Sequence, residues 1–264
     1  MLHLYAESFA PWCEKARWAL DHHGIPYRYT EHVPMIGELR LRLAARRLRG
    51  RVTVPLLVHG RDVLMGSVAI ARFAERVRQR NDASRSTPLF PVGREADLET
   101  WNARSESVMT SGRAMLLARL LRSPAALREQ LPSFIPKALR PVLQPLASSG
   151  VHFLARKYGV RFGEDATHLT RARAALDSLR AALEGGRAWL LDGFSFADIT
   201  MATSLQFILP VADRYMSLGP GTREAWTHPT IASEYADLLA WRDGVYTARR
   251  RPEERVEASG AEVA

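Results

Sequence analysis

The residues best suited to chemistry in this chain lie together near its start, where Pro11, Trp12 and Cys13 directly follow a loop. The residue pattern predicts a strand over Leu2–Tyr5 before the loop and a helix over Trp12–His23 after it. A helix start points unpaired N–H groups and the positive end of the helix dipole at the preceding loop. Such a position stabilises a thiolate or a carboxylate, so the pattern indicates anion or thiol chemistry.

Cys13 is the only cysteine of the 264 residues, so an intrachain disulfide is excluded and a reducing compartment is expected. We expect a buried and inert thiol, because free cysteine is among the most buried residue types. The alternative is a reactive thiolate, since a place in the first helical turn lowers the pKa of a thiol.

Two further polar positions stand where predicted elements begin. Val54-Pro55 opens a strand that continues to His59, and the turn at Gly60-Arg61 predicts a hairpin with a second strand over Asp62–Met65. Gly66-Ser67 follows that hairpin and starts a helix expected over Ser67–Gln79.

Two segments complete this first part of the chain. Tyr27–Thr30 alternates and is rich in strand-forming residues. Glu38–Arg49 has a helical pattern, whose apolar side we expect to consist of Leu39, Leu43 and Leu48. The element order is β-α-β-α-β-β-α, which predicts a small mixed sheet with helices on both faces.

The second part of the chain has a helical pattern throughout. A segment rich in Asn, Asp, Ser, Thr and Pro, Asn81–Pro91, is typical of a linker. We expect a break near Gly112 in the first helix and a frayed, charged tail from Arg249 onward. The predicted helices are Glu95–Leu121, His168–Leu183, Ala197–Leu209 and Glu234–Tyr246. The predicted organisation is a mixed domain over 1–80, a linker over 81–93, an all-helical domain over 94–250 and a flexible tail over 251–264.

A capping pattern precedes the most apolar of these helices. Ser195 is placed as the residue that caps the helix, and Asp198 stands three positions later, where its carboxylate can reach back to the Ser195 N–H. This pattern predicts a helix start and serves folding rather than catalysis.

Composition sets the class of protein. With 47% hydrophobic and 25% charged residues the chain can bury a core and is expected to be globular. The formal net charge of +9 is compatible with small anionic ligands, but the arginines are scattered, which favours a solvated surface over a nucleic-acid site. We expect no membrane span, no signal peptide and no metal cluster, and therefore a cytoplasmic protein without nucleic acid or metal.

The order of Pro11-Trp12-Cys13, Val54-Pro55 and Ser67, followed by Ser195–Asp198, resembles the glutathione transferase superfamily. The resemblance implies an α/β plus all-α fold, in which a thioredoxin-like βαβαββα domain precedes a helical bundle domain. It also implies glutathione as co-substrate and a homodimer.

The resemblance assigns glutathione contacts to four residues. Pro55 is expected to follow a cis peptide bond, and the Val54 backbone is expected to pair with the cysteinyl part of glutathione. Ser67 would hold the γ-glutamyl carboxylate, whereas Gly66 stands where relatives usually have an acidic residue. The alternatives are an edge-strand proline at Pro55 and a helix cap at Ser67. Arginines around the second helix region are further candidates for the glycine carboxylate, namely Arg40, Arg42, Arg46, Arg47, Arg49 and Arg51.

The sulfur-activating position is where the chain departs from the family. Ala10 stands where relatives carry a Ser or Cys, so another group must act on the thiol if the chain is active. Tyr5 and Ser8 are candidates, with a core aromatic and a solvated loop residue as the alternatives. Cys13 matches the second, usually buried cysteine of redox relatives.

We expect a cytoplasmic glutathione transferase that acts in detoxification and conjugates the glutathione thiol to a small apolar electrophile. The pocket is expected between the domains and lined by Trp12, Trp101 and Met109, although helical aromatic and Met residues more often form core. The alternatives are a noncatalytic binding or scaffold protein of the same fold, favoured by Ala10 and Gly66, and a glutathione-dependent redox protein that uses Cys13.

Overall fold

The computed structural model describes residues 1–81, 86–132 and 135–251. The predicted tail over 251–264 therefore lies outside the described residues except for Arg251, and so does part of the predicted linker, residues 82–85.

A four-stranded mixed sheet forms the N-terminal layer. Its strands are β1 (Leu2–Ala6), β2 (Arg28–Glu31), β3 (Leu56–His59) and β4 (Asp62–Met65), in the spatial order β2-β1-β3-β4. β1 pairs parallel with β2 and antiparallel with β3, with Tyr5 opposite Leu56. The central strands carry fully buried leucines, which is what a sheet covered on both faces requires.

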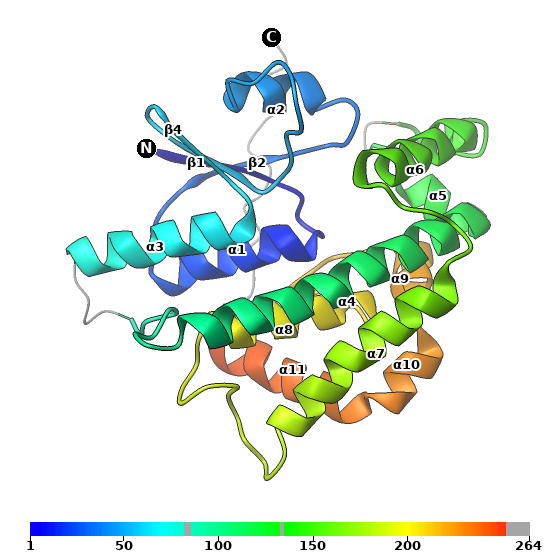
Figure 1. The fold of residues 1–264 in the computed structure, drawn as a ribbon. Coiled ribbons are helices and arrows are strands. Elements are labelled where there is room, and N and C mark those ends of the chain that lie inside the picture. Colours follow the sequence, from blue (N-terminus) through cyan, green and yellow to red (C-terminus); the bar gives the residue numbers. More distant parts are fainter. Residues whose placement is uncertain (82–85, 133–134, 252–264) are drawn as a thin grey trace.

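Helices cover both faces of this sheet. Figure 1 shows α1 (Pro11–His22) and α3 (Ser67–Asn81) on the side toward the rest of the molecule, and α2 (Glu38–Ala44) on the opposite side. The predicted thioredoxin-like order of elements is confirmed.

The prediction for the second helix was wrong in length and in face. α2 ends at Ala44 because Arg46 adopts a positive φ of 53° and the Arg47 N–H bonds back to the Arg42 carbonyl, as in a Schellman stop. Leu41 is the buried residue of this helix, whereas Leu39 and Leu43 are exposed. The inward face is therefore set by Leu41 and Ala45, which pack beside Val52 and Leu56.

The helical domain follows and is wrapped around a long central helix (Figure 1). The prediction of a helical bundle after a thioredoxin-like domain is confirmed. Its described helices are α4 (Glu95–Arg122), α5 (Pro124–Glu129), α6 (Gln144–Tyr158), α7 (Asp165–Ala182), α8 (Phe196–Ser204), α9 (Pro220–Trp226), α10 (Pro229–Glu234) and α11 (Ala236–Arg249), with 3₁₀ turns η1 (Lys137–Leu139) and η2 (Leu205–Phe207). The exact domain boundaries stay predictions.

The reach-back half of the predicted capping pattern is present at the start of α8. The Asp198 carboxylate accepts from the Ser195 N–H at 2.8 Å and from the Leu190 N–H at 2.8 Å. Both loop donors are therefore satisfied, and α8 begins in the buried centre of the domain.

α4 runs without the break expected at Gly112. The reason for glycine there is close packing: a Cβ built on Gly112 would lie 2.3 Å from the Cβ of Phe207. Gly112 lets η2 approach the backbone of α4, and so positions the Phe207 ring.

α1 is fixed to the helical domain by a buried cation. The Lys15 side chain is fully buried, and its Nζ donates to Glu106 Oε1 at 2.9 Å and to Thr200 Oγ1 at 2.9 Å. The same Nζ also contacts Asn102 and Ser105. These partners belong to α4 and α8, so one side chain of α1 joins three helices.

A second buried ion cluster ties α1 to the C-terminal segment. Arg250 donates to Glu14 Oε1 at 2.7 Å and to Asp21 Oδ2 at 2.6 Å, and Arg17 also pairs with Glu14. Arg249 is helical and Arg250 is buried, so the expectation of a frayed tail from Arg249 onward was wrong at these two residues. The sequence pattern there resembles a charged end because the partners are more than 200 residues away.

Replacing Gly112 by alanine should destabilise the fold. The Phe207 Cβ is held close to the backbone and cannot turn away, so overpacking should outweigh the gain in helix propensity and cost about 1–2 kcal/mol. Gly244 in α11 is the control, because no atom lies within 4 Å of a Cβ built there. Gly244→Ala should be neutral or stabilising by up to ~1 kcal/mol. Urea unfolding of both variants measures the difference, and equal stability of Gly112→Ala and the parent would contradict this packing account.

The Glu14 cluster should make stability fall in acid. Burial raises the pKa of Glu14, but the charges of Arg250 and Arg17 outweigh burial and lower it to about 2. Because the pKa of Glu14 is lower in the folded protein than in the unfolded chain, its ionised carboxylate stabilises the fold at pH values above the unfolded pKa of about 4.5. This contribution, about 3 kcal/mol, is lost as the pH falls toward 2.

Glu14→Gln isolates this contribution from the other carboxylates. The variant should be less stable than the parent at pH 6 by roughly 3–5 kcal/mol, because the buried Arg250 and Arg17 lose the negative charge of Glu14. The gap between the two proteins, measured by denaturant unfolding, should narrow below about pH 4.5. A gap that stays constant down to pH 2 would rule out the titration of Glu14.

Candidate functional site

A cavity of about 770 Å³ lies between the sheet domain and the helical domain. One wall comes from the start of α1, the segment before β3 and the start of α3. The opposite wall comes from α4, α6 and the segments that lead to α9. Residues expected from sequence to line a site do so at seven positions: Ala10, Trp12, Arg51, Val54, Pro55, Gly66 and Ser67.

The start of α1 is set by Pro11 at the first helical position, a place where a missing N–H costs nothing. The Ala10 carbonyl accepts from the Cys13 and Glu14 N–H groups, and the Ala10 N–H donates to the Glu7 carbonyl at 3.2 Å. Ala10 therefore presents only its methyl group as a side chain to the cavity.

The Val54-Pro55 bond is cis, as predicted. The Pro55 carbonyl accepts from the Gly66 N–H at 3.0 Å, which holds this segment against the start of α3. The N–H and C=O of Val54 have no hydrogen-bond partner among the described residues, although Val54 lines the cavity. Val54 thus offers one donor and one acceptor to an extended ligand.

The start of α3 contributes a second polar position. Gly66 has a φ of 94° and its carbonyl accepts from the Ile70 N–H, so α3 begins directly after it. Ser67 is largely buried, yet neither its hydroxyl nor its N–H bonds to another described residue. A helix start with a free hydroxyl and free N–H groups suits a carboxylate.

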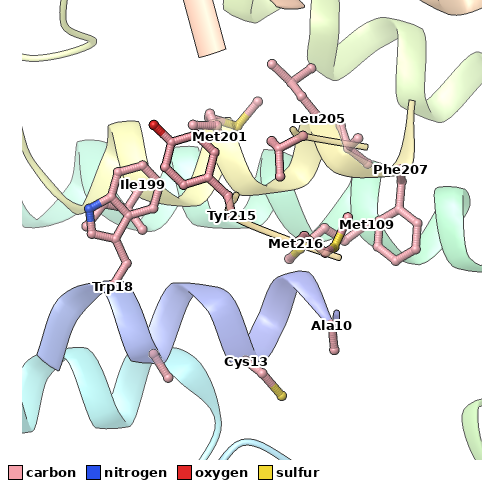
Figure 2. Close-up of a cluster of buried hydrophobic side chains, with 14 of the residues drawn as sticks. Ala10, Cys13, Trp18, Met109, Ile199, Met201, Leu205, Phe207, Tyr215 and Met216 are labelled. Carbon is pink, nitrogen blue, oxygen red and sulfur yellow. The ribbon is translucent and has the colours of Figure 1, made fainter. Parts of the chain in front are cut away.

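The three sequence candidates for thiol chemistry lie outside the cavity wall. The Cys13 thiol is fully buried and accepts from the Glu7 N–H at 3.3 Å, and Figure 2 shows its sulfur pointing away from α8. Burial raises the pKa of Cys13 well above its usual value, which agrees with the expected inert thiol and disfavours a reactive thiolate at this helix start. The polar helix end does not compensate for the loss of water around the sulfur.

Tyr5 and Ser8 are engaged elsewhere. The Tyr5 ring stacks on His3 at 4.4 Å between centroids and packs beside the Leu41 cluster on the α2 side of the sheet. The Ser8 N–H and hydroxyl donate to Glu31. Neither residue lines the cavity, so the structure does not bring them to the place expected for a thiol.

Trp101 and Met109 belong to the core instead of the pocket. Met109 is fully buried, and Figure 2 shows it among the side chains between α4 and η2. Trp101 is 7% exposed and covered by Arg104, whose guanidinium carbon lies 4.5 Å from the indole centroid. The expectation that these two residues line the pocket was wrong, because the inward face of α4 packs on α7 and α8.

Sequence reasoning missed several charged residues of the cavity, among them Glu7 and Arg113. Arg113 stands in the middle of α4, with its guanidinium carbon 4.6 Å from the Trp12 ring centroid and 3.9 Å from that of Tyr158. It forms no ion pair or hydrogen bond with a described residue, and its Nε is buried without a partner. No spacing in the sequence points to a residue 100 positions away from α1.

Glu7 is the acidic group of the same region. It directly follows β1, and its carboxylate has no hydrogen-bond partner among the described residues. Burial, reinforced by the charge of Glu31, raises the pKa of Glu7 to about 7. Glu31 itself accepts from the Ser8 N–H and from the Tyr29 hydroxyl, so it is the satisfied member of this acidic pair.

Trp12 is held by a polar contact. Its Nε1 donates to Glu106 Oε2 at 2.7 Å, and Glu106 also accepts from Lys15 through its other oxygen. The indole is therefore fixed between α1 and α4 and supports Arg113 from one side.

Of the arginines expected near the second helix, Arg51 lines the cavity, and its guanidinium carbon lies 5.3 Å from the Tyr158 ring centroid.

The far part of the cavity is apolar. Phe207 stacks on Trp226 with their ring planes 9° apart, and both line the wall. The other apolar side chains of this region come from α4, α5, α6 and the loops next to them: Leu116, Leu117, Leu120, Leu131, Ile135, Leu146, Val151, Leu154 and Leu218. The arrangement therefore joins a polar end near Ser67 to an apolar end near Trp226.

Comparison with known proteins agrees with this architecture. Residues 9–77 match the sequence family described as "Glutathione S-transferase, N-terminal domain". Residues 9–77 therefore carry a glutathione S-transferase N-terminal domain. Over the rest of the chain the comparisons show likeness of fold to glutathione transferases. No curated protein sequence matches the chain.

Three solved structures illustrate the likeness. Glutathione transferase GSTFuA2 from Phanerochaete chrysosporium has a TM-score of 0.63 at 16% identity, over 96% of this chain and 99% of that one. A glutathione S-transferase from Methylobacillus flagellatus, solved with glutathione bound, gives 0.57 at 15% over 94% and 96%. One from Methylobacterium radiotolerans, in complex with glutathione sulfonate, gives 0.56 at 14% over 100% and 99%.

The described residues contain neither a membrane-spanning helix nor a group of metal ligands. None of the helices is long and apolar enough to cross a membrane. In the same ranges, no three His, Cys, Asp or Glu residues gather as metal ligands would.

Proposed function

We propose that this chain binds glutathione in the polar end of the cavity and conjugates its thiol to an apolar electrophile held in the apolar end. The observation that carries the proposal is the set of unpaired polar groups on Val54 and Ser67, which open into the same cavity as the apolar wall. Similar structures solved with glutathione or its sulfonate support this assignment.

The two polar positions fit different parts of the tripeptide. The γ-glutamyl carboxylate is an anion, which suits the hydroxyl and N–H of Ser67 at the start of α3. The free N–H and C=O of Val54 suit the cysteinyl amide, which would add to the segment like a short strand. Gly66 offers no carboxylate to the ligand's amino group, so Ser67 and Val54 carry most of the recognition.

The apolar end sets the class of co-substrate. Its wall of Leu, Ile, Val and Phe side chains with Trp226 favours an uncharged, largely aromatic or aliphatic electrophile. Holding two reactants in one cavity removes the entropy cost of their encounter, which is the main contribution a transferase of this kind makes. A cytoplasmic role in detoxification fits such a reaction and stays a prediction.

Two alternatives make different use of the same fold. A noncatalytic binding protein is favoured by the methyl group of Ala10, which cannot donate to a thiol. It predicts glutathione binding without turnover of any electrophile in a broad panel. A redox protein that uses Cys13 is disfavoured, because that thiol is buried and its pKa is raised.

Ser67→Ala should weaken glutathione binding about ten- to hundredfold, because one charge-assisted hydrogen bond to the carboxylate is lost. Isothermal titration calorimetry measures the affinity, and thermal unfolding shows whether the helix start is also weakened. Ser178→Ala is the control, since Ser178 is half-buried on α7, lies outside the cavity and bonds to the Ala174 carbonyl of its own helix. Unchanged affinity in a folded Ser67→Ala protein would show that the ligand or its site is a different one.

We also propose that the protein is a homodimer, which is the commonest closed oligomer and is implied by the family resemblance. The expected surfaces are those of α3 and the start of α4. Light scattering at micromolar concentration should give twice the mass of the 29.6 kDa chain. A particle of one chain mass would contradict the proposal.

A further inference from the structure

The cavity holds a carboxylate and a guanidinium that face the same space without forming an ion pair with each other. Glu7 stands at the start of the loop between β1 and α1, and Arg113 stands on the opposite wall. The Glu7 backbone is fixed at both ends, since its carbonyl accepts from the Ala10 N–H and its N–H donates to the Cys13 sulfur. The Glu7 side chain is therefore placed beside Ala10, where the thiol of the proposed ligand would lie.

Arg113 is stacked in a way that leaves its donors available. The Trp12 and Tyr158 rings contact the planar guanidinium at 4.6 Å and 3.9 Å. The guanidinium carbon lies over both rings, and no hydrogen bond to a described residue occupies its N–H donors. Burial lowers the pKa of Arg113, yet it stays a cation, and its buried Nε has no partner among the described residues. An unpaired cation at this depth calls for an anionic ligand.

We propose that Glu7 takes the proton of the bound thiol and that Arg113 holds the resulting thiolate. The inference rests on the proposed function. Glu7 and Arg113 together take the place of the hydroxyl that Ala10 lacks. The S–H bond breaks, its proton moves to a Glu7 oxygen, and the electron pair stays on the sulfur. Arg113 remains protonated throughout and opposes the charge on sulfur.

The surroundings of Glu7 set the pKa of its carboxylate and therefore how well it accepts a proton. Burial and the acidic neighbours raise its pKa to about 7, against the lowering effect of the cations. A base with a pKa near the working pH is about half ionised there and still binds a proton well. The charged or titratable groups around it are Glu31 on β2, Glu38 on α2, Arg113 on α4, Lys157 and Tyr158 on α6, and Cys13 on α1.

Arg113→Gln separates this role from general binding. Calorimetry near neutral pH compares glutathione with S-methylglutathione, whose sulfur cannot ionise. The variant should lose about ten- to hundredfold in affinity for glutathione and less than about threefold for the thioether. Arg113→Lys should lose less, because it keeps the charge. Equal losses for the two ligands would overturn the role of Arg113.

Arg104→Gln is the matched control. Arg104 is also on α4 and also stacks on a tryptophan, but it does not line the cavity. It should bind both ligands as the parent does. Failure of the parent itself to bind either ligand would overturn the proposed function, and with it this inference. Melting temperatures of all variants show whether each protein is folded.

Glu7→Gln tests the proton acceptor with an isosteric side chain. The rate constant kcat/KM for conjugation of glutathione to a generic aryl halide is measured against pH. In the parent it should rise with pH through the pKa of Glu7, about 7, because only the ionised carboxylate accepts the proton. In the variant the inflection near pH 7 should disappear, and kcat/KM should fall about a hundredfold or more. An unchanged pH profile would overturn the role of Glu7, and a parent without activity would overturn the proposed function.

Discussion

The buried ammonium of Lys15 is the contact on which the two-domain arrangement depends. An ammonium without water is stable only if several oxygens surround it, and here they come from α4 and α8. Because those oxygens are fixed on two helices of the other domain, α1 cannot slide or rotate without leaving the cation unpaired. The start of α1 is thereby held opposite the middle of α4, which closes the polar end of the cavity.

The residue before Lys15 on the same helix carries the second constraint. Glu14 points about a quarter-turn away and binds Arg250, so the chain end is drawn back onto the N-terminal helix. Trp18 packs between these contacts and the Tyr246 ring, with centroids 4.6 Å apart. α1 thus contacts the sheet domain, the α4 and α8 layer and the C-terminal segment. Because α1 is held from three sides, the loop before it, which carries Glu7 and Ala10, is held in place as well.

Sequence reasoning succeeded where local physics decides the outcome. The strand pattern, the Val54-Pro55 turn and the helix starts at Pro11 and Ser67 depend on neighbouring residues, and these positions do line the cavity. It failed where distant partners decide. Arg250 resembles part of a charged tail because its partner Glu14 is far away in the sequence. Gly112 resembles a helix break because Phe207, which packs against it, is also distant in the sequence. Arg113 carries no local signal at all, since an arginine in an amphipathic helix is usually a surface residue.

A cation between two rings differs from a hydroxyl as a partner for a thiolate. A hydroxyl offers one hydrogen bond and rotates freely, whereas the rings hold Arg113 in one plane before the ligand arrives. Preorganised charge stabilises a developing anion without reorganisation. Its cost is a buried, unpaired guanidinium in the free protein, which the stacking on Trp12 and Tyr158 partly offsets. Glu106 accepts hydrogen bonds from both the Trp12 indole and Lys15. It therefore connects the Lys15 contact, which joins the two domains, to the ring that supports Arg113, the group that would hold the thiolate.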